Sequence, residues 1–136
     1  MFFAILSAIS AALVAILGKL GISEIDSTLA TTVRAFIMAF FLGGVSLMLG
    51  KFKFMSTISN RAFTFIALSG IAGAMSWLFY FLALKKGPVT GVVALDRLSV
   101  VFALIFAVAF LSEGFTWKNG IGAVLVSLGA IMMSLK

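Results

Sequence analysis

The chain alternates long apolar runs with short polar connections. Five of these runs have approximately the 20 residues that a helix needs to cross a hydrocarbon core about 30 Å thick. They lie at about residues 2–18, 30–50, 62–84, 88–111 and 119–135. Because the connections are too short to form another domain, we predict an all-α integral membrane protein with five transmembrane helices in one domain, residues 1–136.

Composition narrows the functional classes. Of the 136 residues, 63% are hydrophobic and 10% are charged, which excludes a soluble domain. The net charge of +6 comes from basic residues at the ends of the apolar runs, where they reach lipid headgroups, so we expect no nucleic-acid partner. Cysteine and histidine are absent, so we expect no metal and no cofactor. No set of nucleophile and base is visible either, which argues against an enzyme.

The fourth apolar run carries two adjacent charges, Asp96 and Arg97. It begins at Pro88, the only proline, and ends at Glu113, which we expect to brace the turn to the last run. A charge at the centre of a spanning helix costs roughly 2.5–3.5 kcal/mol, and neighbours on a helix point about 100° apart. Each charge therefore needs another partner. We expect Asp96 to bind a substrate amine or a coupling proton, and Arg97 to donate to a substrate carboxylate or phosphate.

Arg34 lies about one turn inside the second run, and two interpretations stay open. It either extends to the membrane surface or faces an internal pathway, where it would contact substrate or pair with Asp96. Four further candidates for the wall of a substrate pocket are Ser76, Trp77, Tyr80 and Ser99. For the two aromatic residues, anchoring at the membrane interface is the alternative. At the start of the second run, Ser27 or Thr28 is expected to cap the helix, and Asp26 is expected to be a solvated charge in the preceding loop.

The last run carries small residues at alternating steps of three and four. They are Gly120, Ala123, Ser127, Ala130 and Ser134. In lipid, helices associate mainly by close packing, so this seam predicts a helix–helix contact, within one protomer or between two.

The charges in the connections are almost equally divided between the two sides of the membrane. With five spans, one side has Lys51, Lys53, Arg61 and Lys118, and the other has Lys19, Lys85, Lys86 and Lys136. Positive charge sets orientation in membranes, so such a balance predicts insertion in both directions. Many transporters consist of two halves of inverted topology, and here a second, inverted copy would supply the missing half. We therefore expect an antiparallel homodimer in the lipid bilayer.

Several short motifs, in order along the chain, resemble the EamA-domain transporters of the drug/metabolite transporter superfamily. They are Arg34-Ala35-Phe36, Leu98-Ser99-Val100-Val101-Phe102-Ala103, Phe110-Leu111-Ser112-Glu113, Gly120-Ile121-Gly122-Ala123 and Leu128-Gly129-Ala130. The chain resembles one five-span repeat of this family, whose longer members carry two repeats of opposite orientation. Val100 stands where members often have Pro, and Ser112 where they often have Gly.

The resemblance implies a secondary transporter that moves a small metabolite or drug-like solute by alternating access, in the cytoplasmic membrane of a prokaryote. Small multidrug resistance transporters are also short, but they have four spans and an acidic residue in the first. This chain has no acid between Met1 and Gly18, so we set that family aside. The other open reading is a non-transporting membrane subunit, in which the charges of the fourth run fix a related partner protein.

Overall fold

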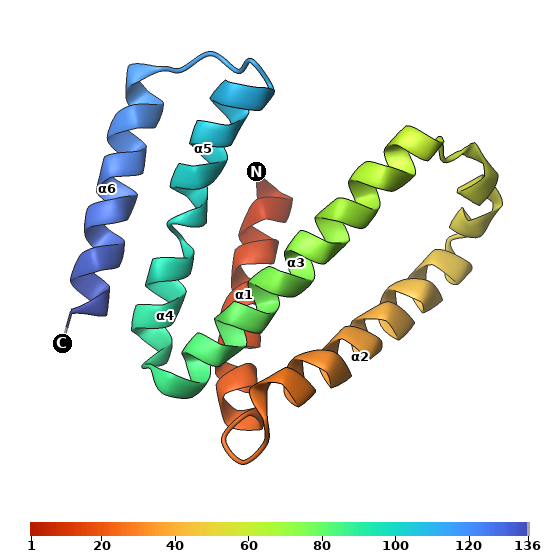
Figure 1. Ribbon diagram of the computed structural model, residues 1–136, viewed down its shortest axis with the longest axis horizontal. Helices are drawn as coiled ribbons and strands as arrows, with labels where there is room; N and C mark the ends of the chain where they lie inside the picture. Colours follow the sequence, from red (N-terminus) through yellow and green to blue (C-terminus); the bar gives the residue numbers. More distant parts are fainter. Residues whose placement is uncertain (136) are drawn as a thin grey trace. The chain divides into compact units, whose positions relative to one another are not determined.

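The computed structural model describes residues 1–135, so Lys136, one of the charges counted above, lies outside the described residues. Its elements are α-helices and one 3₁₀ helix, and residues 1–135 contain no strand (Figure 1). In chain order these are α1 (Phe2–Gly21), α2 (Ser27–Met48), η1 (3₁₀, Lys51–Thr57), α3 (Asn60–Lys86), α4 (Val89–Asp96), α5 (Ser99–Phe110) and α6 (Trp117–Ser134). The predicted all-α class is confirmed.

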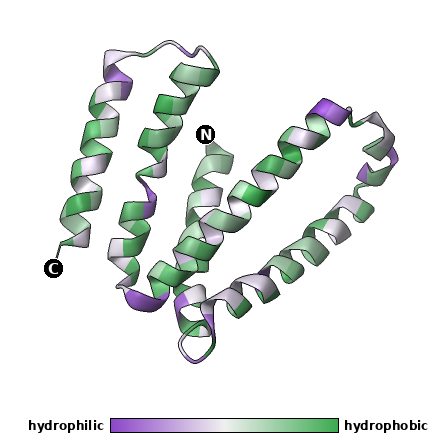
Figure 2. Cartoon of the chain, in the orientation of Figure 1, coloured by the Kyte–Doolittle hydropathy of each residue, from purple (hydrophilic) through white to green (hydrophobic). Residues whose placement is uncertain are grey.

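Within residues 1–135, four helical segments are long and apolar enough to cross a membrane: α1, α2, α3, and α4 with α5 taken together as Val89–Phe110. The fifth predicted span is the 18-residue helix α6, whose first turn is less apolar because it begins with Trp117, Lys118 and Asn119. Large apolar side chains are exposed along the helices, for example Phe40 at 80% and Met48 at 89%. Figure 2 shows hydrophilic residues mainly at helix ends and connections. These surfaces suit lipid, so the chain is an integral helical membrane protein.

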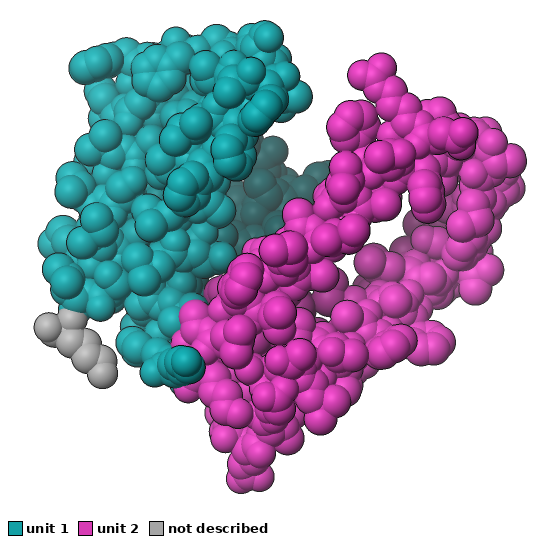
Figure 3. All heavy atoms as spheres, in the orientation of Figure 1, with its two compact units in different colours: residues 1–19, 86–136 teal, residues 20–85 magenta. Residues whose placement is uncertain are grey.

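The chain forms two compact units, residues 1–19 with 86–135, and residues 20–85 (Figure 3). In the first unit, α6 packs against α4 and α5. Small side chains are buried in this packing, with Ala94 of α4 at 6% exposure and Ala130 of α6 at 4%. At the end of α1, Lys19 Nζ donates a hydrogen bond of 3.0 Å to the carbonyl of Gly87, just before α4.

The second unit begins with the connection between α1 and α2, which hydrogen bonds fix in place. Asp26 caps α2, because its carboxylate accepts the N–H groups of Thr28 at 2.9 Å and Leu29 at 3.0 Å. The expectation that Ser27 or Thr28 is the cap was wrong: both lie within the first turn of α2, and Ser27 is buried. Lys85 Nζ donates to the carbonyl of Ile25 at 2.7 Å, which joins the end of α3 to this connection.

The cap also affects the charge of Asp26. The hydrogen bond from the N–H of Leu29 is the main cause that lowers the pKa of this carboxyl below its ordinary value, with help from Thr28 and from the charge of Lys85. Because the pKa of Asp26 is lower in the folded chain, the cap stabilises the fold fully at pH values above the pKa that this carboxyl has in the unfolded chain. This stabilisation is lost as the pH falls through the lower pKa of the folded chain.

The fourth span is broken in its middle. Helix α4 ends at Asp96 and α5 starts at Ser99. Around the break, backbone N–H groups bond to carbonyls three residues earlier in the chain, whereas an α-helix bonds four residues earlier. The N–H of Arg97 donates to Ala94 at 3.1 Å, and that of Leu98 donates to Leu95 at 3.0 Å. The N–H of Val100 likewise bonds to the carbonyl of Arg97 at 3.1 Å. The span therefore changes its helical geometry at the charged pair although it has no proline there.

Helix α5 ends in a turn that contains a strained residue. Ser112 has φ of 54°, the left-handed region that suits glycine. This turn lets the N–H of Glu113 donate to the carbonyl of Ala107 at 3.2 Å. Helix α6 then begins with Thr116, whose side chain accepts the N–H of Asn119 at 3.3 Å.

Ser112→Gly is expected to stabilise the protein. A side chain in the left-handed region costs roughly 1–2 kcal/mol, and the greater freedom of glycine in the unfolded chain returns part of this gain. We expect a net increase of up to about 1 kcal/mol in the free energy of unfolding, measured by denaturation with SDS in mixed micelles.

The matched control is Ser10→Gly in the middle of α1, where the Ser10 hydroxyl donates to the carbonyl of Leu6 at 2.9 Å. Glycine there should lower the free energy of unfolding by roughly 0.5–1 kcal/mol. If both variants lose stability equally, the left-handed turn at Ser112 is contradicted.

Candidate functional site

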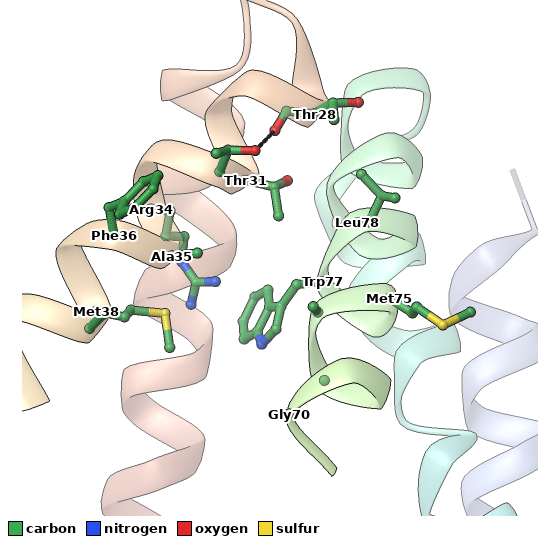
Figure 4. A pocket seen from close by; sticks show the side chains of 14 residues that line it. Thr28, Thr31, Arg34, Ala35, Phe36, Met38, Gly70, Met75, Trp77 and Leu78 are labelled. Atoms are coloured by element: carbon green, nitrogen blue, oxygen red, sulfur yellow. Dashed lines mark hydrogen bonds between the residues drawn. The ribbon is translucent and has the colours of Figure 1, made fainter. Parts of the chain in front are cut away.

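The second unit contains an open groove between α2 and α3, with a volume of about 760 Å³. Most of its walls are apolar, with Arg34 as the single charged side chain among the described residues that line it (Figure 4). Helix α2 contributes Thr28, Thr31, Thr32, Arg34, Ala35, Phe36, Met38 and Ala39, and α3 contributes Gly70, Gly73, Ala74, Met75, Trp77 and Leu78. Both the volume and the composition of the lining are typical of small-molecule sites.

Arg34 stacks on an aromatic cluster of α3. The central carbon of its guanidinium lies 3.7 Å from the centre of the Trp77 ring and 5.6 Å from that of Phe81. Trp77 in turn contacts Tyr80 edge-to-face at 5.5 Å, and Phe81 at 6.0 Å between ring centres. A cation over the face of tryptophan is favourable by roughly 0.5–2 kcal/mol, more where water is excluded. The stack therefore holds the half-buried Arg34 in the groove (Figure 4).

Two of the threonines at the α2 end of the groove already use their hydroxyl protons. Thr31 Oγ1 donates to the carbonyl of Ser27 at 2.7 Å, and Thr32 Oγ1 donates to the carbonyl of Thr28 at 2.9 Å. Their oxygens remain available only as acceptors for a ligand. The N–H groups of Arg34 are therefore the strongest donors that the groove offers.

A second set of candidates lies at the break in the fourth span. Asp96 is the last residue of α4, Arg97 lies in the break, and Ser99 is the first residue of α5. All three are exposed, and within residues 1–19 and 86–135 neither charged side chain takes part in a hydrogen bond or an ion pair. Irregular backbone at membrane depth is tolerated where protein or water surrounds it, and broken helices are common at ion and substrate sites of transporters.

The structure brings only part of the predicted set together. Arg34 and Trp77 meet in the groove, while Tyr80 contacts Trp77 from outside the lining, and Ser76 is exposed on α3. In the predicted seam, Ala130 is buried and the other four residues, Gly120, Ala123, Ser127 and Ser134, are half-buried. Ser127 donates its hydroxyl to the carbonyl of Ala123 at 2.8 Å, within its own helix.

The threonines of α2 that line the groove, Thr28, Thr31 and Thr32, and Met38 were not among the expected wall residues. The signal was present, because Thr31 lies three residues before Arg34 and Met38 four residues after it, which places all three on one helical face. Among these threonines only Thr28 had an expected role, as a helix cap. A hydroxyl inside a span can also bond to a carbonyl of its own helix, as Thr31 and Thr32 do.

Broken spanning helices, and apolar pockets with a few polar groups, are common in multi-pass transport proteins, and this chain has both features. The model of the EamA-like transporter family matches residues 1–135, so the chain belongs to that family and corresponds to one of its five-span repeats. A protein of Sinorhizobium sp, named as an uncharacterized transporter in the cobO 3′ region, is 38% identical over 134 residues, which cover 98% of this chain and 95% of that protein.

A more distant relative is an uncharacterized protein of Methanocaldococcus jannaschii. It is 27% identical over 85 residues, which cover 62% of each chain. No solved structure matches the chain. The comparisons thus support a transporter role, and the bacterial relative agrees with the expected prokaryotic source.

Proposed function

We propose that the chain is a secondary transporter that moves a small metabolite or drug-like solute across the cytoplasmic membrane by alternating access, as an antiparallel dimer of two identical chains. The observation that carries this proposal is the break in the fourth span at Asp96 and Arg97. Two charges inside a spanning segment are retained when a pathway or a partner uses them. Membership of the EamA-like transporter family agrees with this role.

In this proposal the break is also the mobile part of the pathway. Hydrogen bonds between residues three apart have poorer geometry than those of an α-helix. The angle between the axes of α4 and α5 can therefore change at low cost in free energy. Asp96 then binds a substrate amine or a coupling proton, and Arg97 binds an anionic group, as the protein alternates between its two open states. Ser99, at the start of α5, adds a hydroxyl beside them.

The antiparallel arrangement follows from the near equality of loop charges and from the single repeat. A repeat of the EamA type pairs with an inverted repeat in longer transporters, and in this proposal a second copy inserted upside down takes that place. The seam Gly120, Ala123, Ser127, Ala130 and Ser134 is the small-residue surface of α6, and any part that α4 and α5 leave uncovered is available to the second copy.

Labelling of the two termini tests the dimer model. Because the chain has no cysteine, Phe3→Cys and Leu135→Cys each introduce one reactive thiol, at exposed positions near either end. We expect a membrane-impermeant maleimide to label about half of each variant in sealed vesicles, and all of it after permeabilisation, since balanced charges give both orientations.

The matched control changes only the charge balance. Lys51→Gln with Lys53→Gln, both in the exposed η1, leaves fewer positive charges on one side, so labelling should become one-sided. One-sided labelling of the chain without these two substitutions would overturn the antiparallel homodimer. It would then favour a partner protein, as in the non-transporting subunit.

A further inference from the structure

We propose that the groove between α2 and α3 binds the anionic group of a small organic acid, with the guanidinium of Arg34 as its ligand and Trp77 as the stacking surface. The inference deepens the proposed function and rests on it, because it names the class of substrate. It assigns to Arg34 a role that the charged pair of the fourth span does not cover.

The charges of the second unit favour a bound anion at this place. Residues 20–85 contain two acidic side chains, Glu24 and Asp26, and both precede α2. Asp26 is occupied as the helix cap, and none of the described residues that line the groove is acidic. Arg34 is thus a cation in a mostly apolar groove within a spanning helix, and its unit offers no carboxylate in the groove to neutralise it. A bound anion supplies that charge.

The stack on Trp77 leaves the donors of Arg34 free. A distance of 3.7 Å to the ring centre places the indole against the guanidinium and leaves other N–H groups for a ligand. The planar guanidinium group binds a carboxylate with two parallel hydrogen bonds. Thr31 and Thr32 use their protons within α2, so they accept from a ligand but do not compete for its carboxylate.

The remainder of the groove selects the body of the ligand. Its walls are mostly apolar and include Phe36, Met38, Met75 and Leu78. Methionine adapts to ligands of irregular shape, and Trp77 stacks on planar ones. A volume of about 760 Å³ accommodates a metabolite of moderate size. The geometry therefore points to a carboxylate on an aromatic or aliphatic body, in preference to a sugar or an amine.

An anionic lipid presents similar chemistry, but the depth of Arg34 favours a small acid. Arg34 lies seven residues after Ser27, the first residue of α2, which corresponds to about 10 Å along the helix. A phospholipid headgroup sits at the membrane surface, so it does not reach this depth without local thinning of the bilayer.

Fluorescence of Trp77 measures binding directly. In a Trp117→Phe background, Trp77 is the only tryptophan. Titration of the protein in zwitterionic nanodiscs with benzoate, benzamide and benzylamine compares a carboxylate with neutral and cationic probes of the same ring. We expect benzoate to change the emission saturably, and to bind roughly tenfold or more tightly than the other two, because only it pairs with Arg34.

Two substitutions test the assigned ligand. Arg34→Gln should abolish the preference for benzoate, and Arg34→Lys, which keeps the charge but loses the planar fork, should reduce it partly. Arg61→Gln, which removes an exposed arginine at the start of α3, is the matched control and should retain the preference. Equal binding of benzoate and benzamide, or a preference that survives Arg34→Gln, overturns the proposal.

Two further experiments distinguish a lipid ligand from a small acid, and binding from transport. If nanodiscs with an anionic lipid change the emission through Arg34 while benzoate does not, the groove is a lipid site and the proposal is wrong. Counterflow of labelled benzoate in liposomes tests the proposed function. Binding without flux would leave this inference standing and contradict transport of the acid, whereas flux independent of Arg34 would support transport and overturn the inference.

Discussion

Ile105→Pro should unfold the fourth span, whereas Val100→Pro should leave the protein folded. Ile105 is in the interior of α5, so proline there removes a helical hydrogen bond and clashes with a carbonyl one turn before, at a cost of about 3 kcal/mol or more. Val100 is in the first turn of α5, directly after the break, and its N–H already bonds only three residues back, to Arg97. Proline at the start of a helix is tolerated.

The two variants carry the same residue in the same span, so each is the control for the other. The yield of monodisperse protein and the free energy of unfolding in SDS mixed micelles distinguish them. We expect the Ile105→Pro protein to be lost largely to aggregation, and the Val100→Pro protein to remain within about 1 kcal/mol of the original. Equal losses from both would mean that α4 and α5 are one continuous helix.

The break is also the clearest case of what the sequence alone does not reveal. Apolar run length predicted the spans well, because lipid imposes a length of about 20 residues on each helix. Val100 stands where members of the resembled family often have proline, the usual cause of a kink, so the sequence contains no local signal for a break. The structure breaks the helix three residues earlier, at the charged pair, and no local propensity rule predicts a change to 3₁₀ geometry there.

For the candidate site, the sequence indicates which side chains matter but not which of them contact one another. Arg34 stood out because a cation inside a span is costly, and Trp77 because it is a large amphipathic ring. That the two stack at 3.7 Å depends on how α2 and α3 approach each other, which the pattern of a single helix does not contain. Asp26 was missed as a cap for a simpler reason: the chain offers three capping residues in a row, Asp26, Ser27 and Thr28, and the helix starts after the first.

The stack and the break suggest how one repeat divides its work. The second unit holds a cation on a rigid aromatic cluster, which suits binding. The first unit has two exposed charges at the break between α4 and α5, and both helices pack against α6. If the proposed mechanism holds, the packing of α4 on α6 anchors the part of the fourth span that stays fixed while α5 changes its angle.

Gly91→Leu should disrupt that packing. A Cβ at Gly91 would lie 3.4 Å from the Cα of Ser134 and 3.6 Å from the carbonyl oxygen of Met133, both on α6. Alanine therefore fits at ordinary contact distance, but the additional carbons of leucine have no room beside the backbone of α6. We expect Gly91→Leu to lower the free energy of unfolding by about 1–3 kcal/mol, and Gly91→Ala to change it by less than about 1 kcal/mol.

Gly129→Leu is the matched control, because Gly129 lies on α6, the other helix of this contact, and a Cβ there meets nothing within 4 Å. Its free energy of unfolding should stay within about 0.5 kcal/mol, or rise slightly since leucine favours helices. Small residues let α4 and α6 approach closely, and in lipid this contact replaces the hydrophobic effect that joins helices in water. If leucine is tolerated equally at positions 91 and 129, close packing does not hold α4 against α6. The proposal that α4 is the fixed part of the fourth span would then be wrong.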